Sequence, residues 1–357
     1  MTAAFDYGNA RLRAMKSRLL SRRELETLSE GGNPQALIAG LAKTPYRRSL
    51  EAALVRLGGR DAIVLAMREE LEKTVDSLRR FYRGDAAKMV ALILRTYDVR
   101  NLKAVLRELS SPATPDDLAA ALSPTFELST DVLYELAQAA SARAAIDLLA
   151  SMGLPMAAPL MRLRSERPGA ATAEMELRLE QWHFEEAFAS LKEIDDDTLC
   201  EALQLEADLV NLQTVLRMAA APDEQDAWQQ GLGAGDVTLL FVGPGRIHYD
   251  LLAQAARQRT VADAVSLLAD TPYGPPLAAA MEKYGSSSRL SHFEKALYEW
   301  RLARLARLIT RQPLGIGAVL GYLALKTNEI NNLRWITNGI FLGMKAAAIR
   351  EELVHVS

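Results

Sequence analysis

A short phrase that occurs three times constrains the fold of this chain more than any other feature of its sequence. It runs from Asp98 to Lys103, from Asp208 to Gln213 and from Glu329 to Arg334. Each copy starts with an acid, with asparagine three positions later and leucine directly after the asparagine. Apolar residues flank these positions at steps of three and four, which places them on one face of a helix. One helical unit is therefore repeated three times.

The acid and the asparagine of each copy are neighbours on the helix surface. The pairs are Asp98 with Asn101, Asp208 with Asn211, and Glu329 with Asn332. Asparagine is unfavourable inside helices because its amide competes for backbone hydrogen bonds, so its return indicates a repeated structural task. We interpret each pair as binding backbone groups at the end of a neighbouring helix. The alternative is that the three carboxylates surround a pseudo-threefold axis as catalytic acids and bases, although active sites seldom repeat within one chain.

A second phrase, built around proline, also occurs three times. It runs from Leu41 to Leu50, from Leu149 to Leu160 and from Leu268 to Leu277. Proline forces the preceding residue out of helical conformation, so each copy predicts a helix, a break and another helix. The first leucine of each copy precedes the asparagine of the other phrase by 60, 62 and 64 positions. This near-constant spacing supports one ancestral unit.

The repeats predict an all-α protein of three similar helical-bundle domains. A chain of 357 residues is long enough for three cores. Long helical patterns lie between the two phrases, at about 60–83, 171–193 and 289–311. Turn-forming residues then set the expected domains at 1–112, 113–230 and 231–357. The apolar run from Leu239 to Val242 is compatible with either a short strand or a buried helix.

Composition and charge limit the classes of partner. The net charge is −3, from 42 basic and 45 acidic residues, so no general attraction to nucleic acid or to an anionic membrane is expected. The most apolar uncharged run, Pro313–Leu325, is far shorter than the roughly 20 residues that cross a bilayer. The single Cys200 excludes an internal disulfide and suits a reducing compartment, so we expect a cytoplasmic location.

No pattern in the sequence predicts a cofactor or metal site. The glycines between Gly231 and Gly235 precede the strand candidate instead of following it, so they are better read as a linker than as a dinucleotide loop. The four histidines, His183, His248, His292 and His355, have neither the spacing nor the cysteine partners of a metal site. We therefore expect no cofactor and no metal.

The segment Tyr7–Leu20 predicts an amphipathic helix. Leu12, Met15 and Leu19 share one face, and basic residues occupy the rest. Such a helix can dock on a partner or pack on its own domain, and the sequence leaves both possibilities open.

The chain resembles the C subunit of the prokaryotic V-type/A-type rotary ATPases, the relative of the d subunit of eukaryotic V-ATPases. Three features carry the resemblance: the N-terminal segment Tyr7–Leu20, the Thr-Pro-Tyr of two proline phrases, and the Asn-Leu pair of each acid phrase. The resemblance covers essentially the whole chain and includes the threefold repetition. The second copy departs most, because Gly153-Leu154-Pro155 stands where the others have Thr-Pro-Tyr, and Gln213 stands where the others have a base.

The resemblance implies a non-catalytic, funnel-like protein of three similar domains about a pseudo-threefold axis with a central cavity. Such a protein would sit on the cytoplasmic end of the membrane ring of proteolipid subunits and receive the D and F subunits of the central stalk. It would transmit torque that couples ion translocation to ATP synthesis or hydrolysis. Arg47 and Arg48, with Arg11 and Arg13 of the N-terminal helix, are the candidate contacts with acidic groups of a partner.

Two rival classes remain. One is a helical-repeat scaffold for protein interactions that is unrelated to ion transport, although such repeats usually run about 34 to 47 residues, whereas a third of 357 is 119. The other is a helical enzyme whose site the sequence does not reveal.

Overall fold

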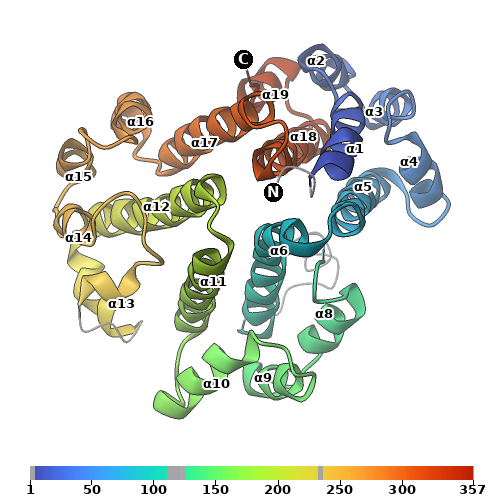
Figure 1. The fold of residues 1–357 in the computed structure, drawn as a ribbon. Helices are drawn as coiled ribbons and strands as arrows, with labels where there is room; N and C mark the ends of the chain where they lie inside the picture. The colour runs from blue at the N-terminus through green and yellow to red at the C-terminus, as the bar shows by residue number, and fades with distance from the viewer. Residues whose placement is uncertain (1–4, 111–121, 123–124, 232–235, 357) are drawn as a thin grey trace. The chain divides into compact units, whose positions relative to one another are not determined.

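The structure is a computed structural model that describes residues 5–110, 122, 125–231 and 236–356. Every regular element among these residues is an α-helix or a short 3₁₀ helix (Figure 1), so the all-α prediction is confirmed. None of the described helices combines the length and the apolar character needed to cross a bilayer.

The chain divides into two compact units. Unit 1 is Met1–Tyr97, Ser123–Phe126 and Leu302–Ser357, and unit 2 is Asp98–Leu122 and Glu127–Arg301. Unit 1 therefore combines segments from both ends of the sequence. The three-domain division, the pseudo-threefold axis and the funnel with its cavity stay predictions.

Unit 1 packs N-terminal helices against C-terminal ones. Its helices are α1 (Asp6–Lys16), α2 (Arg22–Glu30), α3 (Pro34–Leu41), α4 (Arg47–Leu54), α5 (Gly59–Phe81), α18 (Ile316–Phe341) and α19 (Ala346–Glu352). In Figure 1 the blue helices α1, α2 and α3 lie beside the red helix α18. The core mixes both ends, because Leu37, Leu50 and Ile63 belong to the same buried cluster as Leu333 and Ile336.

Unit 2 holds the middle of the chain. Its elements are α8 (Thr130–Ala137), α9 (Ala142–Ser151), α10 (Ala157–Glu166), α11 (Thr172–Ile194), α12 (Asp197–Ala220), η2 (Pro222–Glu224), α13 (Gln225–Gly231), η3 (Val237–Leu240), α14 (Tyr249–Ala256), α15 (Val261–Leu267) and α16 (Gly274–Ser287). Two long helices, α6 (Gly84–Ser110) and α17 (Ser291–Arg311), contribute residues to both units. Buried leucines of α6, such as Leu102 and Leu106, pack with those of α8 and α9.

The proline phrases form the expected pairs of short helices, α3 with α4, α9 with α10 and α15 with α16. Two of the turns have the same pattern of hydrogen bonds. The Thr44 hydroxyl donates to the carbonyl of Leu41 at 2.7 Å and accepts from the N–H of Tyr46 at 3.2 Å. The Thr271 hydroxyl does the same with Leu268 at 2.6 Å and Tyr273 at 3.3 Å. Threonine thus satisfies backbone groups that the break in the helix leaves open.

One open alternative is settled and one helix end needs correction. The apolar run from Leu239 to Val242 is not a strand: Leu239 and Leu240 end the 3₁₀ helix η3, which Asp236 caps by accepting from the Thr238 N–H at 2.8 Å, and Phe241 and Val242 follow it outside any helix. The N-terminal helix ends at Lys16 and not at Leu20, because Ser21 begins α2 with a capping box that Glu24 completes. The expected boundary between residues 112 and 113 lies outside the described residues.

Helix α1 packs on its own unit through Asn9. The Asn9 amide donates to the carbonyls of Pro313 at 3.1 Å and Gly315 at 3.0 Å, and the Tyr82 hydroxyl donates to its Oδ1 at 2.8 Å. Asn9 and Tyr82 are each 1% exposed. The apolar face of α1 is thus occupied within unit 1, while its basic residues face solvent.

We expect Asn9→Ala to lower the free energy of unfolding by about 2–3 kcal/mol, because it leaves buried polar groups without partners. Urea denaturation of the full chain measures the change. Ser17→Ala is the control, since among the described residues its exposed hydroxyl donates only to the Ala14 carbonyl one turn away, and it should cost less than about 0.5 kcal/mol. Equal losses in the two variants would contradict the role of Asn9.

Candidate functional site

The acid of the third repeat lies at the centre of a buried cluster in unit 1, which we call the Glu329 joint (Glu329, Tyr46, Lys326 and the N–H of Leu20). The Tyr46 hydroxyl donates to Glu329 Oε1 at 2.6 Å, and the Lys326 ammonium donates to the same oxygen at 2.7 Å. The backbone N–H of Leu20, one residue before the N-cap of α2, donates to Oε2. Glu329 is 3% exposed, so the carboxylate has exchanged water for protein donors.

The acid of the second repeat makes an equivalent cluster in unit 2, the Asp208 joint (Asp208, Tyr273 and the N–H groups of Arg246 and Ile247). The Tyr273 hydroxyl donates to Asp208 Oδ2 at 2.7 Å. The N–H groups of Arg246 and Ile247, just before the N-cap of α14, donate at 2.9 and 3.2 Å. Gly245 is required at this place, since a Cβ there would lie 1.8 Å from Asp208 Oδ1.

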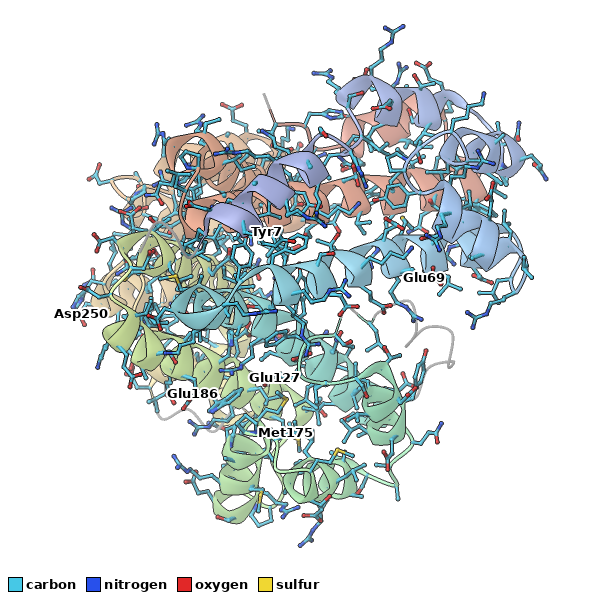
Figure 2. The ribbon with its side chains drawn as sticks, turned by 45° about the vertical axis from the view of Figure 1, so that its right-hand side comes forward. Tyr7, Glu69, Glu127, Met175, Glu186 and Asp250 are labelled. Atoms are coloured by element: carbon cyan, nitrogen blue, oxygen red, sulfur yellow. The ribbon has the colours of Figure 1, made fainter. Side chains whose placement is uncertain are left out.

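The acid of the first repeat is bonded in the same way on its backbone side. The N–H of Glu127, labelled in Figure 2, donates to Asp98 Oδ2 at 2.6 Å, two residues before the N-cap of α8. Met156 occupies the sequence position that tyrosine holds in the other two phrases, and it is fully buried in the core that contains Val99. The second proline phrase therefore has a buried apolar side chain where the other two have a phenol.

Two of the acids bind the proline phrase of another copy. Asp208 of the second copy binds Tyr273 of the third, and Glu329 of the third binds Tyr46 of the first. The asparagines of the second and third copies bind the backbone as well. Asn211 exchanges two hydrogen bonds with the backbone of Val242, at 3.0 and 2.8 Å, and Asn332 exchanges two with Val354, at 2.8 and 2.9 Å. Each amide thereby fixes an extended segment that lacks helical partners.

The two complete joints differ in charge. Lys326 precedes Glu329 by three positions, whereas Leu205 precedes Asp208 by three. Burial raises the pKa of Asp208 above its ordinary value, although the hydrogen bonds from Tyr273, Arg246 and Ile247 and the charge of Arg246 oppose the rise. Burial and the Glu329 charge hold the pKa of Tyr46 well above its usual range, so its hydroxyl remains a donor.

This arrangement favours the structural interpretation of the acids over the catalytic one. Asp98, Asp208 and Glu329 are at most 3% exposed, and each accepts from backbone groups of its own surroundings. A general acid or base must reach a substrate within hydrogen-bond distance. From the sequence we interpreted the two tyrosines only as part of a helix break. The available signal that they donate to the acids was that each directly follows the proline of its phrase.

The four candidate contact arginines fall into two groups. Arg11 and Arg48 line one cavity of about 560 Å³ in unit 1, between α1, the start of α4, α5 and α18. Arg13 instead approaches the carbonyl of Pro313 at 3.5 Å, and Arg47 pairs with Glu51 at 2.7 Å on an exposed face of α4. The cavity also collects Arg18, Lys73 and Lys326, which the sequence did not single out.

Comparison with known proteins matches the chain to one family. The family model described as the ATP synthase (C/AC39) subunit matches residues 8–352. The A-type ATP synthase C subunit of Haloquadratum walsbyi is 26% identical over 352 residues, covering 98% of each chain. That of Methanocaldococcus jannaschii is 24% identical over 364 residues, covering 99% of this chain and 87% of its own. That of Thermococcus kodakarensis is 25% identical over 356 residues, covering 99% and 91%.

We expect Tyr273→Phe to lower the free energy of unfolding by about 1.5–3 kcal/mol, because a buried carboxylate loses one of its donors. Tyr284→Phe is the matched control, since its ring packs on Phe293 and its hydroxyl has no hydrogen-bond partner among the described residues. Chemical denaturation compares the two. A loss in Tyr284→Phe as large as that in Tyr273→Phe would contradict the assignment.

The raised pKa of Asp208 predicts a pH-dependent stability difference from Asp208→Asn. A folded-state pKa above the unfolded value means that the folded chain binds the proton more tightly, so the contribution of Asp208 is greatest in acid. The free energy of unfolding of the wild type minus that of Asp208→Asn should therefore be largest near pH 4 and fall as pH rises towards about 7. Urea denaturation of both proteins across this range measures it, and a difference that increases with pH would be contrary to expectation.

Proposed function

Because this chain belongs to the ATP synthase (C/AC39) subunit family, we propose that it is the non-catalytic adaptor of a rotary ATPase that links the membrane ring to the central stalk. In this role it transmits torque that couples ion translocation to ATP synthesis or hydrolysis. The proteolipid ring and the D and F subunits of the stalk are its proposed partners, at the cytoplasmic face of the membrane. Curated relatives of similar length are named as the C subunits of A-type ATP synthases, which fits an accessory role.

The observation that carries the proposal is the set of buried joints. Force passes through a protein without loss only where its elements do not slip, and fully satisfied buried polar networks fix one arrangement. In the Glu329 joint three donors converge on one carboxylate, and they come from residues near both ends of the chain. The proposed three domains of residues 1–112, 113–230 and 231–357 each contribute one acid to these joints.

The same observation weighs against an open helical-repeat scaffold. In a solenoid each repeat contacts only its neighbours, and terminal repeats are capped. Here the acid of the last repeat binds the tyrosine of the first. A solenoid does not make such a contact between its last and its first repeat.

We expect deletion of this protein to abolish ATP-driven ion transport, while the catalytic head retains ATP hydrolysis. Ion uptake and ATP hydrolysis are measured together in membrane vesicles, with added wild-type protein as the control that restores transport. Transport that survives the deletion would overturn the torque-transmitting role.

The partners are tested separately by affinity purification from detergent-solubilised membranes. The tagged chain should retain both the proteolipid ring and the stalk proteins. Arg13→Glu and Arg47→Glu test two of the contacts predicted from the sequence. Each should weaken retention of a partner that presents acidic groups. Full retention of both partners by both variants would remove Arg13 and Arg47 from the interface.

A further inference from the structure

The cavity in unit 1 carries more positive charge than its surroundings neutralise. Lys73 pairs with Glu70 at 2.8 Å, and Lys326 pairs with Glu329 at 2.7 Å. Arg11, Arg18 and Arg48 have no acidic partner among the described residues. Three uncompensated guanidinium groups therefore line a single concavity in a chain whose net charge is −3.

Another cavity of the same protein shows that such an excess is not a general property of its clefts. A cavity of about 630 Å³ in unit 2 also holds three bases, Lys103, Arg107 and Arg217. Lys103 pairs with Glu180 at 2.9 Å, Arg107 binds Glu176 at 2.7 Å, and Arg217 lies 3.5 Å from Glu294. There each base has an acid, so the excess in unit 1 calls for a separate explanation.

The internal repeat shows that the helix pair of the proline phrase does not require a base at the position of Arg48. Arg48 is the second residue after Tyr46, and the residues in the same place after Met156 and Tyr273 are Ala158 and Pro275. The three phrases nevertheless form equivalent helix pairs. The guanidinium of Arg48 is therefore not needed to form this helix pair.

The remaining lining is suited to a compact ligand. Arg11 lies over the rings of Tyr7 (Figure 2) and Phe81, at 5.8 and 5.5 Å, which holds its guanidinium in place. The Lys326 ammonium has three N–H donors, and Tyr46 and Glu329 take two of them. Pockets of this size typically take small molecules, and arginine forks match the oxygens of phosphate groups.

We propose that this cavity binds a small molecule that carries an oligophosphate group, with Arg18 and Arg48 contacting its phosphate oxygens. Phosphate groups bring several negative charges and many acceptors within the reach of one pocket. Arg11 and the third N–H of Lys326 complete the set of donors. The inference rests on the charge and geometry of unit 1 and does not depend on the proposed role in torque transmission.

The test uses the full-length chain and two probes, tripolyphosphate and ATP, without divalent metal. Isothermal titration calorimetry should show one site, with a dissociation constant below about 1 mM. Equal affinity for the two probes identifies the phosphate group as the whole ligand. Tighter binding of ATP shows that the apolar side of the lining, such as Phe81 and Met15, contacts the nucleoside.

Matched variants locate the site. Arg18→Ala and Arg48→Ala should each weaken binding about tenfold to a hundredfold, since each removes charge-assisted hydrogen bonds. Arg13→Ala on α1 and Arg47→Ala on α4 are the controls, since both residues lie outside the lining, and each should change affinity by less than about twofold. Arg48→Lys should fall between, because it keeps the charge and loses the fork. All these side chains are exposed, so thermal unfolding of each variant should match the wild type.

Two outcomes would overturn the proposal. One is the absence of heat and of thermal stabilisation with about 5 mM of either probe, a concentration at which a pocket of this kind would be largely filled. The other is an equal loss of binding in Arg47→Ala and Arg48→Ala, which would show diffuse attraction to a basic surface.

Discussion

A buried carboxylate that accepts from the backbone just before a helix is the interaction on which each bundle of this protein depends. Removing a carboxylate from water costs several kcal/mol unless donors replace the lost hydration. At Asp208 and Glu329 backbone N–H groups and a tyrosine hydroxyl supply them, and these groups in turn fix where the next helix begins. The hydrogen bonds that stabilise the carboxylate therefore also fix the place where the next helix begins.

The surroundings that offset the loss of hydration differ between the three acids. Lys326 adds a cation beside Glu329, Asp208 has leucine at the corresponding position, and the second proline phrase has buried Met156 where the other two have a phenol. The repeat has kept the acid and the asparagine while the neighbours changed. Such variation is tolerated because only the backbone donors are needed to direct the helix, and the side-chain donors adjust how strongly the charge is held.

Sequence reasoning predicted the helices, their breaks at proline and glycine, and the repeated acids, because these follow from local periodicity and turn chemistry. It did not predict that Tyr46 would meet Glu329, since a contact between residues 283 positions apart leaves no trace in local patterns. It grouped Arg11, Arg13, Arg47 and Arg48 by charge, whereas the structure separates them, because successive helical residues point in different directions. The residues Arg18 and Lys326 became visible only once α1, α5 and α18 were packed around one cavity. Periodicity could not distinguish strand from helix in the run from Leu239 to Val242, and the structure places its first two residues in a 3₁₀ helix that Asp236 caps.

The bond between Tyr46 and Glu329 also sets an order of events during synthesis. A ribosome that adds about 5–20 residues per second finishes Glu329 roughly 15–60 s after Tyr46. Throughout that time Leu37, Leu50 and Ile63 lack Leu333 and Ile336, with which they form one core. Helices α3, α4 and α5 therefore have an open apolar face until α18 has been made, and this interval is when the nascent chain most needs protection from aggregation.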